Sequence, residues 1–151
     1  MTGRAQDQAL RQEQDRRTAE IKRTAYTSLT AHRAYIAYVT SHAPEISVIR
    51  DRDPRPRPAF SGRGHDVREA LETSYTALQL VAAEQETVNQ AHMVFRAARR
   101  IAVAAVDRDP QLHEKLLVFW DLERRLINQL RRELGQQLPL TDACDPEAIL
   151  P

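Results

Sequence analysis

The chain contains few cysteine, glycine and aromatic residues, and the scarcity of each excludes a class of structure. One cysteine, Cys144, in 151 residues cannot form an internal disulfide or a thiolate metal site, so a reducing cytoplasm is the expected compartment. Four glycines and 5% aromatic residues are few for a protein built from sheets and suit helices. No apolar run reaches the roughly 18 residues that a membrane-spanning helix needs, so we predict no membrane partner.

A dominant charge of either sign is also missing. The chain has 22 basic and 21 acidic side chains, which leave a net charge of +1. This near balance excludes a global electrostatic attraction to nucleic acid or to an anionic membrane. Any binding to phosphate groups must therefore be local.

Helical periodicity is what the chain has in abundance. Apolar residues recur at spacings of three and four from Ile21 to Val39 and predict a first helix over about 5–43, whose first half is polar. Pro44 ends this helix, because proline lacks a backbone donor. The connection over 44–65 is rich in proline and arginine, and we expect it to be extended, with some of its apolar residues packed back onto the helices.

Two further apolar stripes predict the rest of the fold. A heptad-like pattern predicts a second helix over about 66–108. The Asp109–Pro110 pair is typical of a helix start and predicts a third helix over about 110–137, followed by a loose tail over 138–151. We therefore expect a single all-α domain over 1–151, in which three long antiparallel amphipathic helices form a helical bundle.

The predicted register of these helices indicates self-association. If the helices pack up, down and up, the third helix lies opposite the polar half of the first helix. Its apolar side chains then lack partners within one chain, and a homodimer is the simplest way to cover them. The side chains expected at this interface are Leu116, Phe119, Trp120 and Leu126.

Arginine clusters offer two candidate binding surfaces. Flexible arginine segments can bind phosphate backbones, although a solvated linker has the same composition, and no known reading module is present. A second set of arginines, in the second and third predicted helices, forms an anion-binding face, an ordinary solvated face or an intermolecular salt-bridge rim. These are Arg96, Arg99, Arg100, Arg124, Arg125, Arg131 and Arg132. The arginines of the connection are Arg50, Arg52, Arg55, Arg57 and Arg63.

Histidine and hydroxyl side chains do not combine into a recognisable reactive site. His32 and His92 lie on apolar stripes, where a bundle places metal ligands, but the predicted register separates them by about 20 Å. The serines and threonines of the first helix have no acid–base pair beside them in the sequence. We therefore predict no metal, no cofactor and no catalytic site, that is, a protein that is not an enzyme.

The stretch from Gln12 to Tyr26, an arginine-rich helix that runs into an apolar stripe, resembles the start of many uncharacterised helical proteins of actinobacteria. The resemblance covers about a quarter of the chain, implies a bacterial cytoplasmic origin, and carries no activity with it. The expected function is a non-enzymatic interaction or scaffolding bundle that self-associates and binds a protein partner. The alternative is a nucleic-acid-associated accessory protein that uses the arginine-rich connection.

Overall fold

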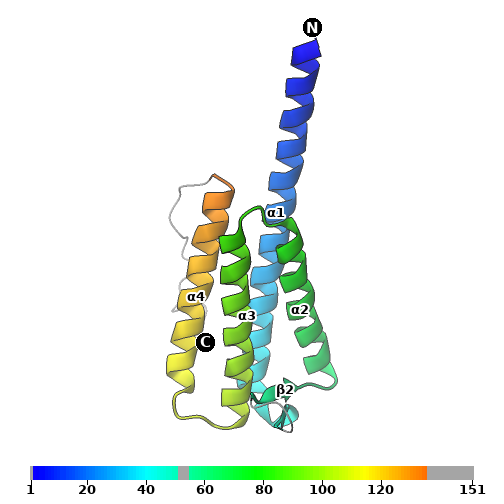
Figure 1. The fold of residues 1–151 in the computed structure, drawn as a ribbon. Helices are drawn as coiled ribbons and strands as arrows, with labels where there is room; N and C mark the ends of the chain where they lie inside the picture. The colour runs from blue at the N-terminus through cyan, green and yellow to red at the C-terminus, as the bar shows by residue number, and fades with distance from the viewer. Residues whose placement is uncertain (1, 51–54, 136–151) are drawn as a thin grey trace.

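The computed structural model describes residues 2–50 and 55–135. Within them the chain folds into a bundle of four helices that run alternately in opposite directions (Figure 1), so the all-α prediction is confirmed. No helix in the described residues combines the length and hydropathy needed to cross a membrane. The helices are α1 (Thr2–Ser41), α2 (Arg63–Val81), α3 (Gln85–Val106) and α4 (Leu112–Glu133).

The connection between α1 and α2 contains a short turn of 3-10 helix, η1 (Ala43–Glu45), and a small antiparallel hairpin of β1 (Ser47–Ile49) and β2 (Arg57–Ala59). It is therefore more structured than the extended segment that we expected. Ile46 is buried and Phe60 packs against the core, which confirms that apolar residues of the connection fold back onto the helices.

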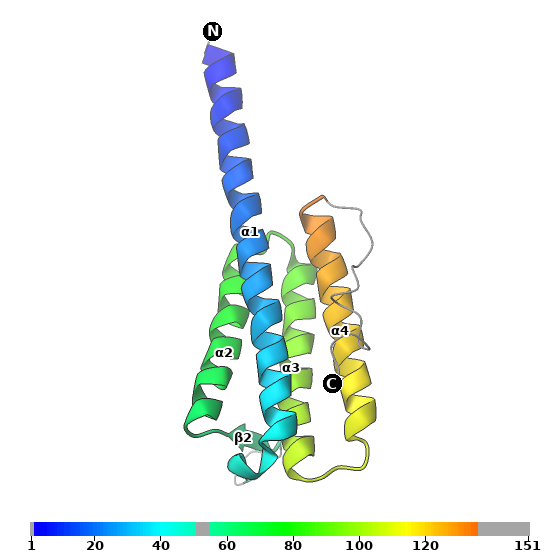
Figure 2. The ribbon, with the colours of Figure 1, turned by 180° about the vertical axis from the view of Figure 1, so that it is seen from behind.

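The single helix expected over 66–108 is two helices, which corrects the predicted three-helix arrangement. The chain reverses at residues 82–84, where Ala82 and Glu84 have extended backbones with ψ angles of 132° and 138°. These residues include neither glycine nor proline, so the local sequence carries no turn signal. As a result α3 runs back beside α1 and α2 instead of extending beyond them (Figure 2).

Side chains of α4 hold this reversal. Glu133 accepts hydrogen bonds from the backbone N–H of Ala83 and, at 2.5 Å, from the hydroxyl of Thr87. Gln129 donates its amide N–H to the Glu84 carboxylate at 2.6 Å. These groups satisfy the start of α3, where amides have no partner within the helix. The helix prediction failed because the capping groups lie far away along the chain.

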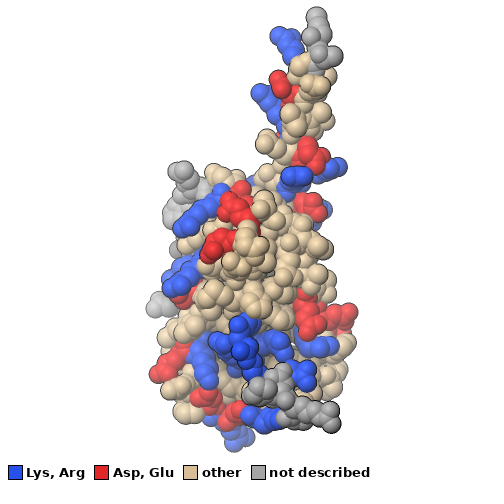
Figure 3. Space-filling model, viewed as in Figure 1, with Lys and Arg blue, Asp and Glu red and all other residues tan. Residues whose placement is uncertain are grey.

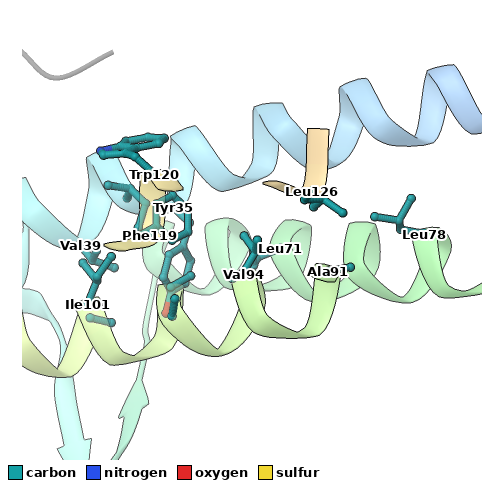
Figure 4. Packing of buried hydrophobic residues seen from close by; sticks show 14 of the residues in the cluster. Tyr35, Val39, Leu71, Leu78, Ala91, Val94, Ile101, Phe119, Trp120 and Leu126 are labelled. Carbon is teal, nitrogen blue, oxygen red and sulfur yellow. The ribbon is translucent and has the colours of Figure 1, made fainter. Parts of the chain in front are cut away.

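Because α3 and α4 fold back, the apolar face of α4 lies in a different place from the one that the sequence predicted. Phe119 packs edge-to-face against His32 of α1, with 6.1 Å between ring centroids, so α4 lies beside the apolar half of α1 and not beside its polar half. Figure 4 shows side chains from the helices converging in this core. The predicted interface residues therefore fill the core of one chain: Phe119, Trp120 and Leu126 are buried, and Leu116 is partly buried against them.

The polar half of α1 projects alone beyond the bundle (Figures 1 and 2). Nearly all side chains from Gly3 to Arg17 are exposed. Glu13 pairs with Arg16 at 2.6 Å and with Arg17 at 3.6 Å, which is the kind of contact that stabilises an isolated helix. At the other end of the chain α4 stops at Glu133, and the predicted tail over 138–151 lies outside the described residues.

Candidate anion-binding site

A hollow of about 560 Å³ lies at the end of the bundle that carries the β1–β2 hairpin, and we call it the cationic hollow. In Figure 3 its basic side chains gather as a blue patch in the lower centre of the face, with acidic side chains on both flanks. Two carboxylates, those of Asp107 and Asp109, also line it. The cationic side chains that line it are Arg55, Arg57, Arg96, Arg99, Arg100 and Lys115.

Two parts of the chain that lie far apart in sequence supply these cations. Arg96, Arg99 and Arg100 have the i, i+3 and i+4 spacing that places side chains on one face of α3. The hairpin packs against α3, and β2 brings Arg57 to the same place. The fold therefore joins the arginine-rich connection to the arginine face of α3.

Both carboxylates of the cationic hollow already have cationic partners. Asp107 accepts hydrogen bonds from Nη2 of Arg50 at 2.5 and 2.6 Å. Asp109 pairs with Lys115, whose hydrogen bond, together with that of the Gln111 amide, holds the pKa of Asp109 below its usual value. Because the acids are engaged in this way, the arginines dominate the electrostatic potential of the hollow.

The guanidinium groups of α3 are left available to a ligand. Within residues 2–50 and 55–135, no ion pair involves Arg57, Arg96, Arg99 or Arg100. Arg99 lies over the ring of Phe95, with 5.8 Å from its Cζ to the ring centroid, which orients the guanidinium through a cation–π contact.

Arg99 also lines a second, small cavity of about 40 Å³. The Tyr35 side chain also lines it and is 1% exposed, and its hydroxyl has no hydrogen-bond partner among the described residues. Burial raises the pKa of this hydroxyl, and the positive charge of Arg99 opposes the shift. The cavity has room for a water molecule or for one polar group of a ligand.

The arginines that the sequence singled out have different positions in the structure. Arg55 and Arg57 line the cationic hollow, and Arg50 holds Asp107 at its edge. Arg63 begins α2 and does not line the hollow, and Arg52 lies outside the described residues. Sequence spacing identified each cluster separately, but their meeting depends on how the hairpin folds onto α3.

A polar cluster in the core was not predicted. Ser28 Oγ lies 3.4 Å from His32 Nε2, and His32 Nδ1 lies 4.0 Å from Glu123 Oε2, which is the order of groups in a hydrolase triad. All three residues are only 2–3% exposed, so a substrate has no path to the serine hydroxyl. Because Glu123 comes from α4, only the fold-back of the helices brings it to His32.

The two histidines considered as metal ligands lie in different surroundings. His32 is in the core, whereas His92 Nδ1 forms a 2.9 Å hydrogen bond with the hydroxyl of Tyr75 on α2. Across the described part of the chain, no group of three histidine, cysteine, aspartate or glutamate side chains is placed to hold a metal ion.

Comparisons of the chain with protein-family models, with curated protein sequences and with solved structures give no significant match. The cationic hollow is therefore the feature of this chain that points to a function.

Proposed function

We propose that this protein binds a compact phosphate-bearing ligand in the cationic hollow. The observation that carries the proposal is the gathering of six cationic side chains around one concavity that has only two carboxylates. One of the six, Lys115, pairs with Asp109, and the other carboxylate, that of Asp107, pairs with Arg50. Guanidinium groups bind phosphate oxygens through two parallel hydrogen bonds, which makes arginine the preferred residue for phosphate recognition. A volume of about 560 Å³ lies in the range of ordinary small-molecule sites.

The limited extent of the basic surface favours a ligand the size of a nucleotide or a sugar phosphate over a nucleic acid. Arg96 and Arg100 lie one helical turn apart, a rise of about 6 Å. Acidic side chains flank the patch on both sides in Figure 3, and the net charge of the whole chain is only +1. A duplex would meet these acids as soon as it extended beyond the hollow, so we favour a compact anion over the nucleic-acid partner predicted as the alternative.

Calorimetric titration with inorganic triphosphate tests the proposal. We expect saturable binding that the double substitution Arg96→Gln and Arg100→Gln weakens by about 100-fold or more, since each charge-assisted hydrogen bond contributes about 1.5–3 kcal/mol. The control is Arg16→Gln with Arg17→Gln, which removes the same charge from the projecting half of α1 and leaves the affinity unchanged.

Either of two results would contradict the proposal. One is an absence of triphosphate binding at low ionic strength, where electrostatic attraction is strongest. The other is an equal loss of affinity in the Arg16 and Arg17 control, which would mean that only the overall charge matters. Tighter binding of a DNA duplex than of triphosphate would instead support the nucleic-acid function.

A second candidate function is non-enzymatic self-association or scaffolding in the cytoplasm, and the projecting half of α1 favours it. A helix that is polar all round and covered by nothing is only marginally stable in isolation, so a bound partner would stabilise it. From Arg4 to Glu20 this helix carries equal numbers of acidic and basic side chains, which lets a second copy pair with it in antiparallel fashion. Light scattering coupled to size exclusion tests this second function. Deletion of residues 2–17 should convert an arm-mediated dimer into a monomer, whereas a full chain whose mass stays at the monomer value of 17.3 kDa at all concentrations contradicts it.

A further inference from the structure

The reversal between α2 and α3 joins two helical hairpins. α1 packs mainly against α2, and α3 packs mainly against α4. The link between the two pairs consists of residues 82–84, Ala-Ala-Glu, flanked by Val81 and Gln85. Alanine, glutamate and glutamine are good helix formers, so the local preference of this link is to continue the helix.

Hydrogen bonds from α4, together with burial of α3 against α1 and α2, oppose that preference. No side chain of the α2–α3 segment itself caps the start of α3. The groups that satisfy the turn are Glu133 and Gln129, which reach across from α4 to Ala83, Thr87 and Glu84. Because these hydrogen bonds join α4 to the link and to the start of α3, they stay with the α3–α4 hairpin when it moves away from α1 and α2. A continuous helix then requires the Ala83 N–H to leave Glu133 and to bond the carbonyl group of residue 79 instead.

Separation of the hairpins exposes an apolar seam that a second copy can cover. Leu71 and Leu78 of α2 and Val94 and Ile101 of α3 are almost fully buried and belong to one core cluster. An identical chain that has opened in the same way offers the same side chains in the same order. The contacts between the two hairpins can then re-form between two chains, which is how domain swapping produces dimers at low energetic cost.

We propose that this chain exchanges its α3–α4 hairpin with a second copy of itself, and that a continuous helix from α2 into α3 replaces the turn at residues 82–84. The partner is a second copy of the chain, and the interface is the core seam already present in the monomer. This dimer does not depend on the projecting half of α1, and the cationic hollow would form twice in it, with β2 and α3 contributed by different chains.

The exchange changes one distance by a large amount. Glu69 and Arg100 are both exposed, and they lie toward the same end of the antiparallel helices α2 and α3. In a continuous helix they would be 31 residues apart, which corresponds to about 46 Å. Spin labels at these two positions, in a chain whose Cys144 is replaced by serine, therefore distinguish the two forms.

A proline at the start of α3 provides a selective block. Gln85 is the first residue of α3, where proline is tolerated, and Glu84 before it already has the extended backbone that a following proline requires. In a continuous helix the same proline would occupy an interior position and would clash with the preceding turn. Gln85→Pro should therefore leave the monomer intact and prevent the exchange, while Gln85→Ala serves as the matched control.

The experiment is to unfold the doubly labelled protein together with an excess of unlabelled chain, refold the mixture at high concentration, and measure mass by light scattering and the label distance within one chain by pulsed electron spin resonance. The excess of unlabelled chain is needed because Glu69 of one chain again lies near Arg100 of the other in the exchanged dimer. Wild type and Gln85→Ala should yield a dimer fraction with the long intrachain distance. Glu133→Ala should increase that fraction by several-fold, and Gln85→Pro should abolish it while its monomer keeps the wild-type circular dichroism spectrum.

Four results would overturn the proposal. The first is a wild type and a Glu133→Ala variant that both refold only to monomer. The second is a dimer that, diluted with unlabelled chain, keeps the short distance between the two labels of one chain, since this indicates side-by-side association. The third is a Gln85→Pro variant that dimerises as well as Gln85→Ala. A dimer that disappears only when residues 2–17 are deleted also contradicts the exchange and supports pairing of the projecting helices.

Discussion

Glu123 places a carboxyl group in the core, where ionisable side chains are rare unless they are paired. Its side chain is almost fully buried, and neither carboxylate oxygen has a hydrogen-bond partner among the described residues. Burial raises its pKa from 4.5 to about 7, against the opposing charge of Arg33. His32, which lies opposite, has its pKa lowered from 6.5 to about 4 by burial, with a contribution of the same sign from Arg33.

These two shifts affect stability in opposite directions. For Glu123 the folded chain keeps a proton that the unfolded chain has released, so its contribution to stability falls as pH rises from about 4.5 to about 7. For His32 the unfolded chain binds a proton that the folded chain rejects, so its contribution falls as pH drops from about 6.5 to about 4. The two effects largely cancel between these limits, which flattens the pH dependence of the wild type.

Glu123→Gln tests this account. The substitution keeps the size of the side chain and removes its titration, so its stability relative to wild type should increase by about 3 kcal/mol between pH 4 and pH 8. Urea unfolding of both proteins across this range measures the difference. A difference that is constant with pH would show that Glu123 does not titrate in the folded chain.

At the scale of elements, the start of α2 packs closely against the end of α1 and the hairpin. Gly64 lies at this junction and has the closest neighbours of any glycine in the described residues. A Cβ atom on Gly64 would lie 2.8 Å from Cε1 of Tyr38 and 3.1 Å from Phe60. The Tyr38 ring has little freedom to move, because its hydroxyl donates to Glu45 at 2.8 Å and its face stacks on His42. This close approach sets where α2 meets the end of α1.

Gly64→Ala should therefore destabilise the bundle by about 1–3 kcal/mol through overpacking. The control is Gly3→Ala, because a Cβ atom at that position of α1 meets nothing within 4 Å. The control should be neutral or slightly stabilising, since alanine favours helix. Thermal unfolding compares the two, and equal effects would contradict the packing argument.

A second prediction at the scale of elements concerns the reversal between α2 and α3, which depends on Glu133. Glu133→Ala removes two hydrogen bonds from the turn and should lower the free energy of unfolding of the monomer by about 1–2 kcal/mol. Glu20→Ala, at an exposed position of α1, is the control and should change it by less than about 0.5 kcal/mol. Urea unfolding at low protein concentration measures both, and an equal effect of the two variants would mean that Glu133 does not stabilise the turn.

At the scale of the whole molecule, the projecting half of α1 and the bundle are energetically separate. The buried core begins at Ile21, and nearly all side chains before Thr18 are exposed. Deletion of residues 2–17 should therefore shift the urea midpoint of the monomer only slightly, since it removes almost no buried apolar surface. Circular dichroism should report a loss of helix in proportion to the deleted residues. A large drop in the midpoint would mean that this segment contacts the bundle in solution.

The cationic hollow combines local and long-range determinants. The spacing of Arg96, Arg99 and Arg100 identifies one face of a helix, because side chains three and four residues apart are neighbours whatever the tertiary structure. The position of this face opposite Arg57 was not predictable, because it depends on the folding of the β1–β2 hairpin onto α3. The pairing of Asp107 with Arg50 and of Asp109 with Lys115 likewise exists only in the folded chain.

The sequence by itself determined the helical class, the polar and apolar halves of α1 and the restart after Pro110, because helical periodicity and proline chemistry act over a few residues. Only the tertiary structure decided that the chain reverses at residues 82–84. There the local residues favour helix, and hydrogen bonds from Glu133 and Gln129, together with burial of the apolar faces of α3 and α4 against α1, outweigh that preference. The same reversal places Phe119 in the core instead of at an interface, because the fourth helix that it creates covers the apolar seam that three helices would have left open.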